Sequence, residues 1–160
     1  MGRSKRVVLL TDEVMEPRKQ AFPGVADPWS TRAVFAIRAL AQGINDAANT
    51  WLAPFGLTAT KYNYLVTLYR CEGQALSLNE LSGYIHTSNA SVTSVIDALE
   101  KDDLVERVEH PSDRRSVLAR LTRKGRAATE EAFPAHHHNI ELMMSRLNDD
   151  ERRMLVALLV

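Results

Sequence analysis

The stretch SLNELSGYIHTSNASVTSVIDALEK, residues 77–101, decides the fold. Ser77 followed by Glu80 has the spacing of a capping box, which predicts a short helix over LNELSGYI. Ser88 or Asn89 is then predicted to cap a second helix. A short helix, a tight turn and a second helix form the helix-turn-helix plan, in which the second helix enters the major groove of DNA.

The second helix is predicted to have two contrasting faces. Apolar residues spaced three or four apart predict the face that packs on the core: Val92, Val95, Ile96 and Leu99. Small polar residues, which let the backbone approach DNA and can bond phosphates or base edges, occupy the first turn and the other face: Ser88, Asn89, Ser91, Thr93 and Ser94. The alternative interpretation is an ordinary solvated face, because Ser and Thr are common caps.

A basic hairpin is predicted directly after this helix. Apolar residues alternate on both sides of the turn HPSD, residues 110–113, as in two short strands. The chain has 20 Lys+Arg and 20 Asp+Glu, so its formal net charge is zero, yet residues 107–126 hold seven basic residues against two acidic ones. Arg114 and Arg115 at the tip predict a wing that reaches the minor groove, where a narrow groove attracts arginine. Arg123 and Lys124 are predicted to contact phosphates.

The whole chain is expected to be mainly α-helical with a small β-hairpin wing, organised as a winged helix-turn-helix. We expect an N-terminal extension at residues 1–28, a DNA-binding lobe at 57–122, and a helical dimerisation region formed by 29–56 and 123–160. In the dimerisation region, a helix from Ser30 or Thr31 is predicted to end at Pro54.

The remaining helices follow from caps and breakers. Thr58 or Thr60 is expected to begin a helix that runs to about Arg70. A break is expected at Gly125, followed by a long helix interrupted or restarted around Pro134. Asn148 or Asp149 is expected to cap a last helix ending in MLVALLV, residues 154–160, whose apolar side chains require a partner surface, most simply a second subunit.

Other function classes lack their sequence signals. There is no Gly-rich phosphate loop, Gly-x-Ser-x-Gly or His-Glu-x-x-His motif, so we expect no enzyme and no cofactor. His136, His137 and His138 are adjacent and would point about 100° apart in a helix, which argues against one shared metal ion. His137 and Glu141 do have i,i+4 spacing. The single cysteine, the lack of a long apolar run and the poor signal-peptide pattern favour a cytoplasmic protein.

Three segments of the chain resemble MarR-family transcriptional regulators. They are LTATKYNYLVTLYR (57–70), LNELSGYIHTSNASVTSVIDALEKDDLVER (78–107) and SDRRSVLARLTRKG (112–125). The resemblance implies a homodimer with interleaved first and last two helices. It also implies one winged helix-turn-helix per subunit, a pseudo-palindromic operator in double-stranded DNA, and a repressor that responds to a ligand.

The resemblance also implies roles for residues of the wing. Arg115 would be the minor-groove arginine, and Asp113 would bond it and hold it extended. Family members often carry basic residues where this chain has Ser94 and Ala98. Direct readout of guanine by an arginine of the helix is therefore not expected here.

An effector site is implied by the same resemblance. Family pockets lie between the dimer helices and the DNA-binding lobe and often take aromatic or phenolic compounds. Here the residues are Trp29, Arg32, Trp51 and Tyr62, and each has an alternative interpretation as a core residue. Family members that sense urate-like ligands use an acid where this chain has Asn63, so that specificity is not expected. Cys71 is interpreted either as an oxidation sensor or as a packing residue.

Two further functions remain open at this point. A winged helix can also bind proteins, and Arg114 and Arg115 would then dock an acidic partner without direct DNA binding. A small-molecule-binding protein without a DNA function would make the charge of the wing incidental. DNA binding that depends on salt separates the first interpretation from both alternatives.

Overall fold

A computed structural model of the chain describes residues 28–71, 74–110, 112 and 117–160. The expected N-terminal extension up to residue 27, and the wing residues Asp113, Arg114 and Arg115, lie outside the described residues. The chain divides into two compact units, Met1–Ala47 and Ala48–Val160, and the division falls within helix α2 (Pro28–Leu52).

The described part of the first unit is the N-terminal portion of α2. The described residues are already helical at Pro28, so the expected start at Ser30 or Thr31 is wrong. This portion of α2 exposes several large apolar side chains: Trp29, Val34, Phe35, Ile37 and Leu40.

In the second unit, the predicted end of α2 at Pro54 is confirmed. The helix stops at Leu52, and a 3-10 turn follows over Ala53–Phe55. Gly56 closes this turn in the left-handed region with φ of 70°, a conformation that glycine adopts without steric cost. The chain can then turn directly into the next helix.

Three helices form the centre of the second unit. Helix α3 (Ala59–Arg70) begins at its cap Thr58, and α5 (Asn89–Lys101) begins at its cap Ser88. Helix α4 (Leu78–Ile85) has the predicted capping box between Ser77 and Glu80. Their apolar faces meet in one core, whose fully buried side chains include Tyr64, Leu65, Leu68, Leu81, Val92, Ile96 and Leu99.

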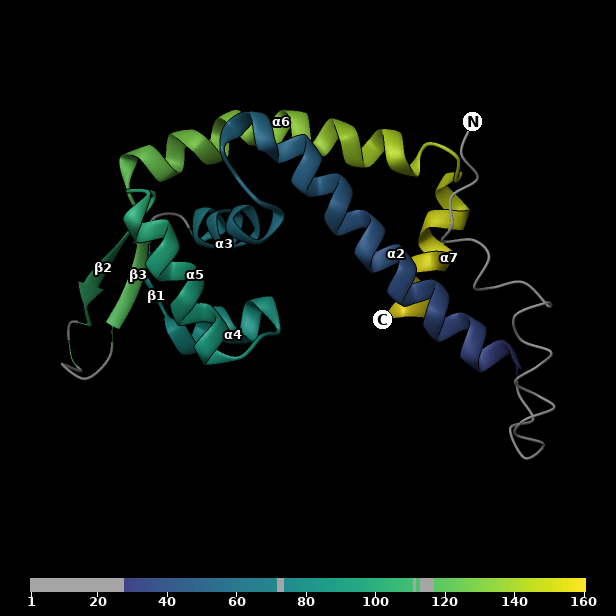
Figure 1. Ribbon diagram of the computed structural model, residues 1–160, viewed down its shortest axis with the longest axis horizontal. Helices are drawn as coiled ribbons and strands as arrows, with labels where there is room; N and C mark the ends of the chain where they lie inside the picture. Colours follow the sequence, from purple (N-terminus) through teal and green to yellow (C-terminus); the bar gives the residue numbers. More distant parts are fainter. Residues whose placement is uncertain (1–27, 72–73, 111, 113–116) are drawn as a thin grey trace. The chain divides into compact units, whose positions relative to one another are not determined.

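The small sheet has three strands rather than the expected two. Strands β2 (Val105–Glu109) and β3 (Val117–Leu121) form the predicted antiparallel pair. Strand β1 (Leu76–Ser77) adds to the other edge of β3, giving the order β1-β3-β2. Figure 1 shows β2 and β3 side by side. Because β1 immediately precedes α4, this pairing fixes the helix-turn-helix to the wing.

Two expectations about helix α6 (Arg123–Met144) are wrong. The helix begins at its cap Thr122, so Gly125 lies inside its first turn instead of marking a break. Pro134 lies within the helix and does not interrupt it. Thr129 and Ala132, in the part of the helix before the proline, are buried, and α6 contacts α3.

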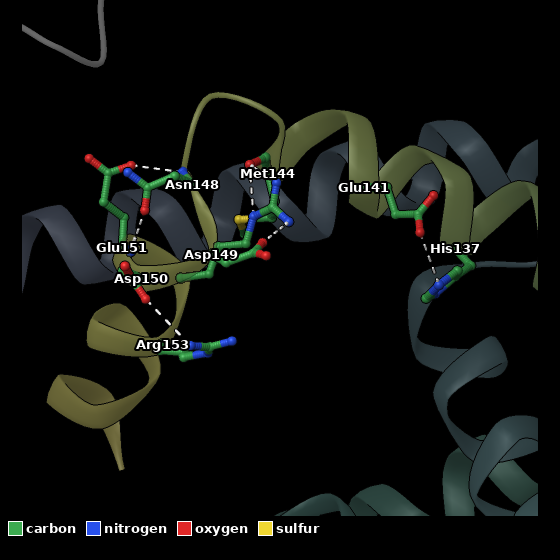
Figure 2. A network of polar contacts seen from close by, with 9 residues as sticks. His137, Glu141, Met144, Asn148, Asp149, Asp150, Glu151 and Arg153 are labelled. Carbon is green, nitrogen blue, oxygen red and sulfur yellow. Dashed lines mark hydrogen bonds and ion pairs between the residues drawn. The ribbon is translucent and has the colours of Figure 1, made fainter.

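Helix α7 (Asp149–Leu159) begins at its cap Asn148, which is one of the two predicted caps. Asn148 accepts a hydrogen bond from the Glu151 N–H at 3.0 Å, and its own N–H donates to Glu151 Oε2 at 2.8 Å (Figure 2). The helix exposes apolar side chains over its last two turns: Met154, Val156, Leu158 and Leu159, followed by Val160. Within the described part of the chain, no helix combines the length and apolar character needed to cross a membrane.

Candidate DNA-binding and effector sites

Helix α5 presents the two predicted faces. Val92, Ile96 and Leu99 are fully buried, and Val95 is half-buried. Of the side chains predicted to meet DNA, those on α5 and at its cap are exposed: Ser88, Asn89, Ser91, Thr93 and Ser94. The apolar residues thus hold the helix on the core, and the small polar residues remain accessible to a partner.

Local hydrogen bonds orient several of these polar groups. The Ser88 and Ser91 hydroxyls lie 3.0 Å apart, and the Thr93 hydroxyl donates to the Asn89 carbonyl at 3.0 Å. The Asn89 amide donates to Asn79 Oδ1 on α4 at 2.7 Å. An amide nitrogen carries two hydrogens and a hydroxyl oxygen retains lone pairs, so each group keeps capacity for DNA.

The turn between α4 and α5 is held by residues that the sequence reasoning did not single out. His86 ends α4 in the left-handed region with φ of 55°. The Ser82 hydroxyl donates to the Thr87 carbonyl at 2.6 Å. Asn79 adds the contact to α5 described above. Histidine adopts the left-handed region more often than most residues do, so His86, two positions before the cap Ser88, was the available signal for this conformation.

Much of the basic charge counted in the hairpin is paired with acids of the same unit. Arg107 on β2 forms ion pairs with Asp97 and Glu100 on α5. Arg120 Nη2 lies 2.8 Å from Glu106 Oε1 on the neighbouring strand. The described part of the wing therefore carries less net charge toward a partner than the residue count suggests.

The two basic residues after the hairpin differ in their surroundings. Lys124 donates from Nζ to the backbone carbonyl of Asp102 at 2.7 Å, at the C-terminal end of α5. The hydrogen bond from Lys61 on α3 lowers the pKa of the Asp102 carboxyl, and the charges of Lys61, Lys124 and Lys101 act in the same direction. Arg123 is exposed at the start of α6.

The effector residues that the family resemblance implied divide between the two units. Trp29 and Arg32 belong to the first unit, where the Arg32 guanidinium lies 5.1 Å from the Trp29 ring centre. Trp51 and Tyr62 belong to the second unit, where both pack on His136, with ring centres 6.0 and 4.6 Å away. Burial raises the pKa of the Tyr62 hydroxyl.

A cavity of about 540 Å³ lies between α3 and α6, and the sequence reasoning missed it. Its walls are mainly apolar and include a cation and a carboxylate. The lining residues are Val66, Tyr69, Arg70, Thr129, Glu130, Phe133 and Pro134. The Tyr69 hydroxyl donates to Glu130 Oε1 at 3.0 Å, and the Arg126 guanidinium lies 5.0 Å from the Tyr69 ring centre.

The sequence held one signal for this cavity. Tyr62, Val66 and Tyr69 have helical spacing on α3, and they continue one face from the predicted effector residue Tyr62. Phe133 and His136 have the same relation on α6. The cavity thus lies along the same pair of helices as the contacts of Tyr62 with His136.

The histidine run has separate surroundings rather than a shared site. His137 Nε2 lies 3.5 Å from Glu141 Oε1, the predicted i,i+4 pair (Figure 2). The His137 ring also stacks on the ring of Phe133. His136 faces Trp51 and Tyr62 instead. In the described ranges, no group of three or more His, Cys, Asp or Glu side chains is arranged to hold a metal ion.

Comparisons with known proteins agree with this architecture. The MarR family pattern matches residues 57–117. The HTH-type transcriptional regulator MhqR of Bacillus subtilis (strain 168) is 33% identical over 118 residues, which cover 74% of this chain and 80% of MhqR. The HTH-type transcriptional repressor YetL of the same organism is 28% identical over 133 residues, covering 83% of this chain and 80% of YetL.

A solved structure extends the similarity to three dimensions. A mutant of MarR from E. coli, complexed with operator DNA, superposes with a TM-score of 0.75 at 25% sequence identity. The match covers 88% of this chain and 94% of that one. The predicted mainly α-helical winged helix-turn-helix is thereby confirmed. The chain belongs to the MarR family and is a DNA-binding transcriptional regulator.

Proposed function

We propose that this regulator is a cytoplasmic, homodimeric repressor that binds a pseudo-palindromic operator and responds to a small aromatic or phenolic effector. The observation that carries the proposal is the exposed polar face of α5 on a winged-helix scaffold. The likeness to MarR complexed with operator DNA supports it.

In this proposal, α5 lies in the major groove and supplies contacts from Ser88, Asn89, Ser91, Thr93 and Ser94. Small side chains at the start of a helix allow close approach, and the free N–H groups there favour a phosphate. The wing would place Arg114 and Arg115 at the minor groove, with Asp113 bracing Arg115. Arg123, exposed at the start of α6, would contact a phosphate.

A second copy of the chain would cover the exposed apolar residues of α7. Leu158 is 78% exposed and Met154 is 66% exposed, and both lie in the last two turns of that helix. Contiguous apolar surface of this kind is typical of an interface. A Leu158→Asp variant should sediment as a monomer and lose operator binding, because two half-sites about 34 Å apart need two linked recognition helices.

The cavity between α3 and α6 is the effector site that we propose. Val66, Phe133 and Pro134 offer apolar walls to a flat ring, and Arg70 offers a cation to a carboxylate or phenolate. The cavity adjoins α3, which packs on both α4 and α5. An occupant would therefore act on the packing that orients the recognition helix.

The first experiment selects DNA from a random pool with the purified protein and footprints the enriched sequence. A two-fold symmetric footprint whose affinity falls with salt is expected. An asymmetric or absent footprint, together with binding to an acidic protein partner, would favour the protein-interaction alternative instead.

The second experiment tests the effector site with 4-hydroxybenzoate as the probe. The probe should weaken operator binding of the parent protein, and Arg70→Gln or Phe133→Ala should blunt that response. Arg146→Gln is the matched control, because Arg146 is exposed and is not part of the cavity lining. An equal response of all three variants would place the effector elsewhere.

A further inference from the structure

Arg107 joins β2, the first strand of the wing, to the recognition helix through its guanidinium and its backbone. Its Nη2 lies 2.6 Å from Asp97 Oδ1, its Nη1 donates to Glu100 Oε2, and its backbone N–H donates to Glu100 Oε1 at 3.3 Å. The Arg107 side chain is 26% exposed, whereas those of Asp97 and Glu100 are 59% and 41% exposed. The arginine thus lies beneath two acids that face solvent.

The position of Asp97 makes this contact relevant to DNA. Asp97 follows Thr93 by four residues and Ser94 by three, so it continues the face of α5 that is exposed and polar. A carboxylate on a surface that approaches phosphates is repelled by them, and the repulsion grows as water is excluded. The recognition helix therefore carries an acid where an unpaired acid would oppose binding.

The electrostatics of the cluster agree with a firmly held cation. Partial burial by itself lowers the pKa of Arg107, but the hydrogen bonds to Asp97 and Glu100 and their charges outweigh burial, and the net effect raises it. Both carboxylates thus have a permanent countercharge. A lysine could supply the charge at this place but not the planar fork that reaches two carboxylates at once.

We propose that Arg107 is a positioning residue for DNA binding, which neutralises Asp97 and Glu100 on α5 without contacting DNA itself. The inference rests on the proposed placement of α5 in the major groove. It also changes the interpretation of the seven basic residues at 107–126, because Arg107 is one of them and its charge is used within the protein.

Two other roles for Arg107 make different predictions. If Arg107 contacted phosphate directly, removing its acidic partners would leave a free cation, but removing Arg107 could not be rescued by removing the acids. If Arg107 only joined wing to helix, removing the acids would be as harmful as removing the arginine. A double-mutant cycle separates these roles from the proposal.

The experiment measures operator affinity for the parent protein, Arg107→Gln, Asp97→Asn/Glu100→Gln, and the triple variant, on DNA selected with the parent. Arg107→Gln should weaken binding by roughly tenfold or more, because it leaves two uncompensated acids beside the DNA. The acid-free double variant should bind at least as well as the parent. The triple variant should recover to within about threefold of the parent, since no charge then remains to be neutralised.

Two further variants complete the design. Arg120→Gln is the matched control, because Arg120 pairs with Glu106 within the hairpin rather than with α5, and its loss should change affinity little. Arg107→Lys should retain part of the affinity, because the charge remains while one of the two bridges is lost.

The outcomes separate the inference from the function on which it rests. A triple variant as weak as Arg107→Gln, or a double variant weaker than the parent, overturns the proposed role of Arg107. The double variant keeps the test decisive even if Arg107→Gln unfolds, which thermal melts of each variant would reveal. A parent protein that selects no DNA would overturn the proposed function itself, whatever Arg107 does.

Discussion

Gly125 lies so close to Leu104 that a Cβ atom at residue 125 would be 1.9 Å from the Leu104 carbonyl oxygen. Gly125 is in the first turn of α6, and Leu104 lies between α5 and β2. The same Leu104 carbonyl accepts a hydrogen bond from the Thr122 N–H at 3.1 Å. The start of α6 is therefore seated directly on the backbone that connects the recognition helix to the wing.

A Gly125→Ala substitution should consequently destabilise the protein. Alanine favours a helix over glycine by about 1 kcal/mol, but here the added methyl group must displace backbone, and overpacking of this kind costs about 1–3 kcal/mol. We expect a net loss in the free energy of unfolding, measured by urea denaturation. Gly83→Ala is the control, since Gly83 is helical with nothing within 4 Å of the added carbon, and it should gain up to about 1 kcal/mol. Equal responses of the two variants would contradict the contact.

Lys124 and Arg123 should behave differently although they are neighbours of like charge. Lys124 donates to the Asp102 carbonyl at the C-terminal end of α5, where a cation also interacts favourably with the helix dipole. Lys124→Gln should therefore lower the free energy of unfolding by about 0.5–1.5 kcal/mol. Arg123→Gln should leave stability within about 0.5 kcal/mol. It should instead reduce the salt slope of DNA binding by about one. The reverse assignment would show that Lys124 is the phosphate contact.

Local signals in the sequence predicted most of the fold. The caps at Thr58, Ser77 and Ser88 and the alternation of β2 and β3 depend on residues within a few positions of one another. Such patterns are written in short windows of sequence, which is why helix starts and the hairpin were predictable.

The features that were missed all depend on contacts between distant residues. Strand β1 has two residues, too few to show the alternation of apolar and polar residues typical of a strand. It is a strand because its backbone pairs with β3. Gly125 was predicted to be a helix breaker, because the sequence alone does not show that Leu104 lies against it and leaves no room for a Cβ atom. Arg107 was counted as free charge because Asp97, ten residues away, becomes its partner only when the wing folds against α5. Residue composition measures charge but not pairing.

The wing tip offers a direct test of the family-derived roles of Asp113 and Arg115. Arg115→Ala should weaken operator binding strongly, because a minor-groove arginine uses both its charge and its length. Asp113→Ala should weaken binding less, since it removes only the brace that holds the arginine. Gel shifts on the selected operator would measure both effects. If both variants bind like the parent protein, the wing does not contribute to binding.

His136 places an ionisable ring at the contact between α6, α3 and the end of α2. Its ring lies against Trp51 and, edge to face, against Tyr62. Its Nδ1 atom is buried and has no hydrogen-bond partner among the described residues. Burial, followed by the charge of the neighbouring His137, lowers the pKa of His136 below the ordinary value of 6.5.

Stability should therefore fall as the solution becomes mildly acidic. The unfolded chain binds the His136 proton more readily than the folded chain, so the contribution is present in full above about pH 6.5 and is lost as the pH falls below that value. His136→Phe keeps an aromatic ring and removes the proton-binding site. We expect its urea midpoint to change less between about pH 8 and pH 5.5 than that of the parent. His138→Gln, at an exposed position of the same helix, should retain the pH dependence of the parent, and a loss there equal to that of His136→Phe would rule out His136 as the source.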